Sequence, residues 1–155
     1  VIPLQNLSQK GYELTLLIAG THGKDKLIPV FKNVELKVVQ EYNHAEIANL
    51  VEKIDIGVMP LDDGPWEKGK CGLKLLIYMV AGKPSVASPI GENVYIIEDR
   101  LNGFLVKSPV EWEQRLEELF QDPELYKQIA SQGLKTVQEK YSLEYVYHLI
   151  RAELD

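Results

Sequence analysis

The sequence has one cysteine and no excess of positive charge, and both shortages exclude classes of function. A single cysteine among 155 residues can form neither an internal disulfide nor a cysteine-rich zinc site, so we expect a reducing, cytoplasmic compartment. The 17 lysines and arginines are outnumbered by 23 aspartates and glutamates, and the formal net charge is -6. This balance argues against a nucleic-acid groove and against a basic membrane footprint.

Long apolar runs and a leader sequence are also missing. No run of about 18 apolar residues occurs, so no transmembrane segment is expected. Residues 1–10 lack the order of basic, apolar and small residues of a signal peptide. The length and an apolar fraction of 45% fit one packed domain. The first residue is Val1 rather than Met, in what reads as the tail of a helix, and we expect a piece of a longer protein.

Short apolar runs alternate with segments of helical spacing. The runs that predict strands cover residues 12–20, 34–40, 55–61, 84–88 and 103–106. The segments that predict helices between them cover residues 44–54, 71–81 and 92–99. This alternation predicts an α/β fold with a Rossmann-like, doubly wound parallel sheet and right-handed crossovers. Ligands of such sheets bind beyond the carboxyl ends of the strands.

The last third of the chain predicts a helical tail of three helices. Ser108 and Glu111 have the spacing of a capping box, and the Asp-Pro pair at residues 122–123 repeats the start signal for a second helix. Ser142 begins the third. One side of that helix is apolar and packs either on this sheet or on another domain; it carries Leu143, Val146 and Ile150.

The segment "GKCGLK" at residues 69–74 is the strongest candidate for a binding loop. A glycine-rich loop that runs into a helix presents unpaired backbone N–H groups and the positive end of the helix dipole, which suits phosphate. Gly69 and Gly72 permit close backbone approach, and Lys70 or Lys74 adds positive charge. The segment matches neither G-x-G-x-x-G nor a P-loop. From the residues alone, a tight strand-to-helix turn with solvated lysines explains it equally well.

Three stretches together carry a family resemblance. "DIGVMPL", "GKCGLKLLIYMVAGKPSVAS" and "GENVYIIEDRLNGFLV" resemble, in this order, the C-terminal, nucleotide-sugar-binding domain of retaining glycosyltransferases of GT-B architecture, the glycosyl transferases group 1 family. The resemblance implies that residues 1–155 form a single donor-binding domain, one half of a GT-B architecture. It also implies that the first strand of this domain and an N-terminal, acceptor-binding domain precede Val1.

The resemblance assigns roles to the candidate loop. The residues that bind the donor diphosphate would be Gly69, Lys70, Cys71, Gly72, Leu73 and Lys74. Lys74 would stabilise the leaving group during transfer of a hexose from a nucleotide diphosphate sugar, with UDP or GDP as nucleotide. The implied setting is carbohydrate biosynthesis in the cytoplasm, or at the cytoplasmic face of a membrane. No tightly bound cofactor, metal or nucleic acid is implied, and the fragment alone would be inactive.

Three positions depart from the family pattern. Two glutamates usually stand eight positions apart, the second of them on the donor ribose, and here these positions are Gly69 and Ile77. A third carboxylate is replaced by Tyr95. Isoleucine cannot accept a hydrogen bond from ribose, so the alternative is a non-catalytic glycosyltransferase-like interaction module. A weaker alternative is an unrelated flavodoxin-like ligand-binding domain.

Other candidates favour structural roles. His22 and Lys24 follow the first predicted strand, where a solvated loop is favoured over donor contact. Trp66 fits an interaction residue and a core anchor equally well. Cys71 is expected to be a small buried residue rather than a nucleophile. An acidic group in a predicted turn is not expected to bind metal; it comprises Asp62, Asp63 and Glu67.

Overall fold

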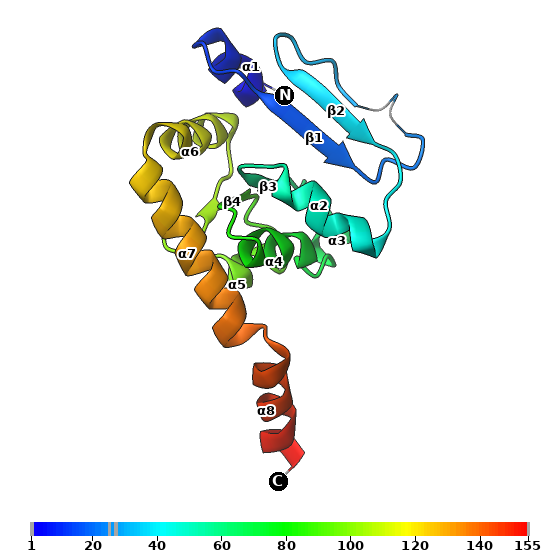
Figure 1. The fold of residues 1–155 in the computed structure, drawn as a ribbon, viewed down its shortest axis with the longest axis vertical. Coiled ribbons are helices and arrows are strands. Elements are labelled where there is room, and N and C mark those ends of the chain that lie inside the picture. Colours follow the sequence, from blue (N-terminus) through cyan, green and yellow to red (C-terminus); the bar gives the residue numbers. More distant parts are fainter. Residues whose placement is uncertain (1, 25, 27, 155) are drawn as a thin grey trace.

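The structure is a computed structural model that describes residues 2–24, 26 and 28–154. Two parallel sheets and their flanking helices form an α/β fold (Figure 1). β1 (Thr15–Ala19) pairs with β2 (Glu35–Val39). The second sheet has the order β3-β4-β5 and contains β3 (Gly57–Met59), β4 (Ser85–Ala87) and β5 (Phe104–Leu105).

All five predicted strands are present and parallel to their partners, which confirms the Rossmann-like fold class. The structure differs from the prediction in how the strands pair. β1 and β3 are not hydrogen-bonded to each other, so the strands form two sheets instead of one. Apolar patterning identifies each strand but does not determine its neighbours, since pairing depends on which edges meet in space.

The helices follow the predicted order with one addition. They are α1 (Ile2–Gln9), α2 (Ile47–Glu52), α3 (Pro65–Lys68), α4 (Leu73–Val80), α5 (Asn93–Ile96), α6 (Pro109–Gln121), α7 (Pro123–Lys140) and α8 (Leu143–Leu154). The short helix α3 lies where the sequence predicts only a turn. Its proline at the first helical position, after Gly64, is a start signal that the turn-like composition concealed.

Two hydrophobic clusters cover opposite faces of the second sheet. The first cluster contains Leu7, Val86, Phe104, Val106, Leu116, Leu119 and Ile129. The second cluster contains Met59, Leu75, Met79, Ala87, Ile96 and Ile97. Val86 and Ala87 are successive residues of β4, both without solvent exposure, and therefore point to opposite faces. Helix α1 contributes to the first cluster and α4 to the second.

The predicted caps of the tail are present with one change. Ser108 Oγ accepts a hydrogen bond from the Glu111 N–H (3.3 Å), but the strongest bond of the Glu111 carboxylate is to the Lys107 N–H (2.6 Å) rather than to Ser108. This bond holds the pKa of Glu111 below its ordinary value. Asp122 caps α7 by accepting from the N–H groups of Glu124 and Leu125.

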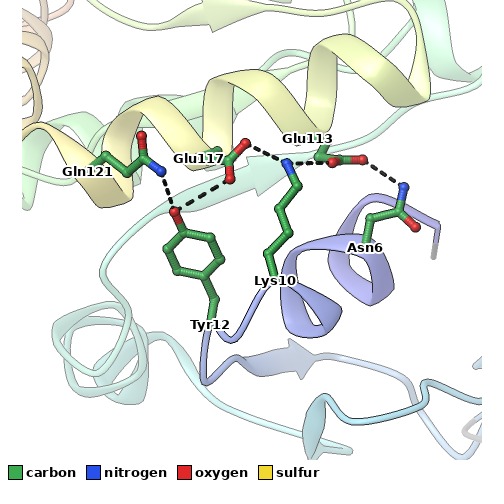
Figure 2. A network of polar contacts seen from close by, with 6 residues as sticks. All are labelled: Asn6, Lys10, Tyr12, Glu113, Glu117 and Gln121. Atoms are coloured by element: carbon green, nitrogen blue, oxygen red, sulfur yellow. Dashed lines mark hydrogen bonds and ion pairs between the residues drawn. The ribbon is translucent and has the colours of Figure 1, made fainter.

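A polar network ties the start of the chain to α6 (Figure 2). Asn6 Nδ2 donates to Glu113 at 2.7 Å, and Lys10 Nζ lies between Glu113 and Glu117. Gln121 donates to the hydroxyl of Tyr12 at 2.6 Å. These bonds fix α1 and the start of β1 against a helix that lies more than 100 positions later in the sequence.

Helix α8 extends away from both sheets (Figure 1). The apolar side chains of residues 143–150 are exposed, including Leu143 at 90%, Val146 at 42% and Ile150 at 57%, so they do not pack on this sheet. In the described part of the chain, no helix is both long enough and apolar enough to cross a bilayer.

Candidate functional site

The candidate loop lies where the fold places ligand sites. β3 ends at Met59 and β4 at Ala87, and the segment 60–72 leads from the first of these ends to α4. We call residues 69–74, at the start of α4, the α4 site. Carboxyl ends of parallel strands meet at one edge of a sheet, and loops from that edge are the usual source of ligand contacts.

Gly72 forms the turn into α4, at a position that accepts only glycine. Its φ is +67°, in the left-handed region, and the residue serves as the helix N-cap. A Cβ at this position would overlap the Cδ1 atom of Ile96. The same glycine therefore provides both the required backbone conformation and the close contact with α5.

The backbone N–H groups of the α4 site fall into two sets. Those of Gly69 and Lys70 donate to the carbonyls of Trp66 and Glu67, at 3.3 and 3.2 Å, and close the end of α3. The N–H groups of the last four residues, Cys71, Gly72, Leu73 and Lys74, have no hydrogen-bond partner in the described part of the chain. In the first turn of a helix, such groups point out of the N-terminal end and favour an anion there.

A second loop, after β4, borders the α4 site. Gly91 has a φ of +56°, and a Cβ there would lie 2.7 Å from the carbonyl oxygen of Lys68. Glu92 follows, and its Cβ is 3.5 Å from the position that a Cβ on Gly72 would take. The Leu61 N–H donates to Ser88 Oγ at 2.9 Å and links the two loops at their base. The turn at Gly91 and Glu92 thus borders the α4 site on one side.

Sequence reasoning did not single out Glu92. It is the acidic residue beside Gly72, and its charge contributes to raising the pKa of Tyr141, after the larger effect of burial. The signal that could have identified it is its position directly beyond the carboxyl end of a predicted parallel strand, next to a glycine.

The two lysines of the α4 site differ in whether they pair with a nearby carboxylate. Lys70 Nζ lies 4.0 Å from the Glu67 carboxylate, a contact within one helical turn. Lys74 is exposed and has no ion pair with another described residue. Lys74 is therefore the side chain free to meet a bound anion.

Ile77 and Tyr95 stand where the resembled family has carboxylates, and neither side chain is acidic. Ile77 lines an apolar groove of about 650 Å³ between α2 and α4, together with Ile47, Val51 and Val80. Tyr95 is 77% exposed on α5. Leu75 and Met79 of α4 are enclosed, whereas Leu73 and Val80 are more than half exposed. Val80 also lines the groove.

The remaining candidates lie at the surface. His22 and Lys24 are exposed in the loop after β1. Trp66 is 79% exposed on α3, which excludes the core-anchor interpretation. Cys71 is exposed, so the prediction that it is buried is wrong: the helix begins two residues later and leaves it in the loop. Asp63 forms an ion pair with Lys68 at 2.8 Å.

Comparison with known proteins gives a consistent result. The family described as "Glycosyl transferases group 1" matches residues 3–122. No curated protein matches the chain. Solved structures do, at sequence identities that show the fold alone.

Three solved structures illustrate this likeness. The C-terminal domain of a glycosyl transferase group 1 family protein (LpcC) from Francisella tularensis has 19% identity and a TM-score of 0.62, over 91% of this chain and 93% of that domain. HepE of Anabaena, in complex with UDP-glucose, has 18% identity and a TM-score of 0.69, over 99% of this chain and 44% of that protein. A glycosyltransferase from Rickettsia africae has 20% identity and a TM-score of 0.72, over 98% of this chain and 41% of that protein. The chain thus spans less than half the length of the last two.

Proposed function

Because the chain belongs to the glycosyl transferases group 1 family, we propose that it is the donor-binding half of an enzyme that transfers a hexose from a nucleotide diphosphate sugar to an acceptor, with retention. The acceptor-binding half, and the group that activates the acceptor, would come from a further domain of the same protein. The fragment alone is then inactive in transfer. The single cysteine supports a cytoplasmic location as part of this proposal.

One observation carries the proposal. Among the described residues, the N–H groups of Leu73 and Lys74 have no partner at the start of an eight-residue helix, directly after Gly72. A diphosphate is the part of a nucleotide sugar that such a helix end binds. UDP or GDP is the nucleotide we propose, and UDP-glucose in the HepE structure supports the first.

The chemistry follows from the charge that develops on the leaving group. When the bond between the sugar and the β-phosphate breaks, negative charge grows on the phosphate oxygens. N–H groups fixed by the helix stabilise that charge without reorganising, and the Lys74 ammonium adds a positive charge near it. Gly72 holds these donors in place, and no side chain of the α4 site acts as a nucleophile.

Binding can be tested on the 155-residue chain. UDP, GDP and ADP are titrated separately to about millimolar concentration, a range that detects weak sites, and backbone amide shifts are recorded by two-dimensional NMR. We expect shifts at residues 71–74 for one nucleotide. Shifts confined to other surfaces, or none for any nucleotide, would contradict donor binding at the α4 site.

Catalysis is tested in the full-length protein. Lys74→Ala should lower kcat about tenfold or more with a smaller change in KM, as expected for a group that acts mainly on the developing charge. Lys135→Ala is the control, because Glu139 on α7 is the one ion-pair partner of Lys135 within the described part of the chain. Unchanged kinetics for Lys74→Ala would remove the role assigned to this lysine.

A second function is favoured by Ile77 and Tyr95. Neither residue can bind ribose or the sugar as a carboxylate would, so the chain could serve as a non-catalytic interaction module. The two functions are distinguished by the full-length protein: an interaction module binds no nucleotide and transfers no sugar. If Ile77→Glu restores or strengthens donor binding, the protein derives from an enzyme whose donor site was weakened or lost.

A further inference from the structure

Exposed aromatic side chains gather beside the α4 site. Trp66 on α3 and Tyr95 on α5 are both more than three-quarters exposed, although tryptophan is highly buried on average. Leu73, at the start of α4, and Val94, on α5, are exposed as well. A single apolar side chain at the surface needs no explanation, but a group of neighbouring large ones marks an interaction site.

The single turn of α3 holds Trp66 in place. Pro65, at the first helical position, has a fixed φ that suits a helix start. The Lys68 N–H donates to the Gly64 carbonyl at 3.1 Å, and the Gly69 N–H donates to the carbonyl of Trp66 itself at 3.3 Å. Within the described part of the chain, the indole N–H of Trp66 has no hydrogen-bond partner. The backbone of Trp66 is therefore held while its side chain stays available to a ligand.

The single turn of α5 directs Tyr95 outward. Asn93 and Ile96 are 1% and 2% exposed, and residues three positions apart lie on one side of a helix. The Asn93 side-chain amide donates to the Ser88 carbonyl at 2.9 Å, and the Tyr95 N–H donates to the Glu92 carbonyl at 3.0 Å. Helix α5 is thus anchored through its buried side, and the ring of Tyr95 stays at the surface.

The end of α3 and the loop before α5 are in contact. A Cβ on Gly91 would lie 2.7 Å from the carbonyl oxygen of Lys68, so the two segments pack without an intervening side chain. Chain geometry then places the Cα atoms of Trp66 and Tyr95 no more than about 20 Å apart. Helix α5 lies beside α4, where it packs on Gly72 of the α4 site (Figure 1). Both aromatic residues therefore border the α4 site, and one extended ligand can reach both.

The surroundings of the two rings suit a saccharide. A sugar ring has C–H groups on its faces, which pack on the negative face of an aromatic ring, and hydroxyl groups around its edge, which need hydrogen bonds. Asp63 and Lys68, which stand on either side of Trp66 in the sequence, are exposed and form an ion pair at 2.8 Å. The exposed Glu92 precedes Tyr95 by one turn. Each ring thus has charged neighbours that can bond hydroxyl groups.

We propose that Trp66 and Tyr95 bind the acceptor of the transfer and that this acceptor is a saccharide. The inference rests on the proposed function and adds the class of acceptor to it. In the transfer, an acceptor hydroxyl oxygen bonds to the donor sugar carbon as the bond from that carbon to the phosphate oxygen breaks. The hydroxyl proton passes to the group that the further domain supplies. The acceptor must therefore lie next to the diphosphate, at the α4 site that the two rings border.

Two other occupants fit this surface less well. An anionic membrane attracts basic segments, whereas the formal net charge of this chain is -6. The centre of a protein interface is depleted of charged residues, whereas charged side chains stand close to both rings in the sequence, namely Asp63, Lys68 and Glu92. A saccharide uses the rings and the charged groups together.

The test measures binding of the fluorescently labelled full-length protein to an array of immobilised oligosaccharides of defined structure. The wild type should bind at least one of them. Trp66→Leu and Tyr95→Leu should weaken that binding about tenfold or more, as expected for aromatic anchors. Trp66→Tyr and Tyr95→Phe keep a ring and should retain most of it, which separates stacking on a ring from plain apolar contact. Tyr147→Leu is the control, because Tyr147 is an exposed tyrosine on α8 and should not affect binding.

Nucleotide titration of the same variants separates this inference from the proposed function. Trp66→Leu and Tyr95→Leu should bind UDP or GDP as the wild type does, because the rings contact the acceptor. Nucleotide binding without saccharide binding, or equal saccharide binding by the leucine variants and the wild type, would overturn the inference and leave the proposed function intact. A lower Tm of Trp66→Leu with unchanged saccharide binding would show that Trp66 packs on another domain, and would also overturn it. Absence of nucleotide binding by the wild type would contradict the proposed function, and the inference would fall with it.

Discussion

The ammonium of Lys10 lies 2.7 Å from the carboxylate of Glu117, although 107 positions separate the two residues in the sequence. The same ammonium lies 2.9 Å from Glu113, so one lysine just after α1 holds two glutamates of α6 (Figure 2). Because α1 leads directly into β1, this contact places the first sheet relative to the helical tail.

Removal of this lysine should loosen the start of the chain. Lys10→Met keeps much of the aliphatic stem but leaves Glu113 and Glu117 without a cation, so the urea midpoint should fall, and more strongly at low salt. Lys127→Met is the matched control, because Lys127 is 69% exposed and, of the residues that the structure describes, pairs only with Glu124 one turn away. Equal midpoints for the two variants would show that Lys10 does not anchor α1.

The same network predicts a loss of stability in acid. The Asn6 amide, followed by Lys10, holds the pKa of Glu113 below its ordinary value of 4.5. A lowered folded pKa contributes stability that is present above the unfolded value and is lost as the pH falls through the folded value. The free energy of unfolding should therefore drop below about pH 4.5, and this drop should be shallower in Glu113→Gln. Parallel curves for the two proteins would contradict the assignment.

The network also predicts a loss at high pH. Glu117 and Glu113 raise the pKa of Lys10 above its ordinary value of 10.5. A raised folded pKa contributes stability that is present below the unfolded value and is lost as the pH rises through the folded one. Stability should fall above about pH 10.5, and Lys10→Met should remove that part of the fall. Urea unfolding across this range measures it.

Two glycines with the same backbone conformation allow the cost of backbone strain to be measured separately from the cost of a steric clash. Gly72 and Gly82 have φ values of +67° and +66°, but only Gly72 has no space for a Cβ; around Gly82, nothing lies within 4 Å. Gly82→Ala should cost about 1 kcal/mol from its backbone alone. Gly72→Ala should cost more, because Ile96 must also move, and should weaken nucleotide binding at the α4 site. A smaller loss for Gly72→Ala than for Gly82→Ala would refute this account of the turn.

Asn102 should be the most sensitive polar residue of the core. It is 4% exposed, accepts from the Glu98 N–H at 2.8 Å and donates to the Ile96 carbonyl and Thr136 Oγ1. Asn102→Leu leaves the Glu98 N–H and the buried Ile96 carbonyl without their side-chain partner and should cost about 2 to 4 kcal/mol of unfolding free energy. Thr136→Val removes one side-chain partner and should cost about 1 kcal/mol. Chemical denaturation of both variants tests this order.

The sequence determined the local structure of this protein. Apolar runs located all five strands, and the Ser-Pro and Asp-Pro signals located α6 and α7, because strand patterning and capping act over a few neighbouring residues. The glycines and lysines of residues 69–74 also indicated a binding loop, since their types and their place ahead of a helix can be read along the chain. Helix α3 was missed because a four-residue helix has too few positions to show a period.

Only the tertiary structure decided which parts meet. It separated the N–H groups of residues 71–74, which are unpaired within the described part of the chain, from those of Gly69 and Lys70, which close α3. It placed Glu92 beside Gly72 and left Cys71 exposed. It also divided the strands into two sheets with open edges at β1 and β3. These features depend on contacts between residues far apart in the chain, and apolar patterning carries no information about which distant segments become neighbours.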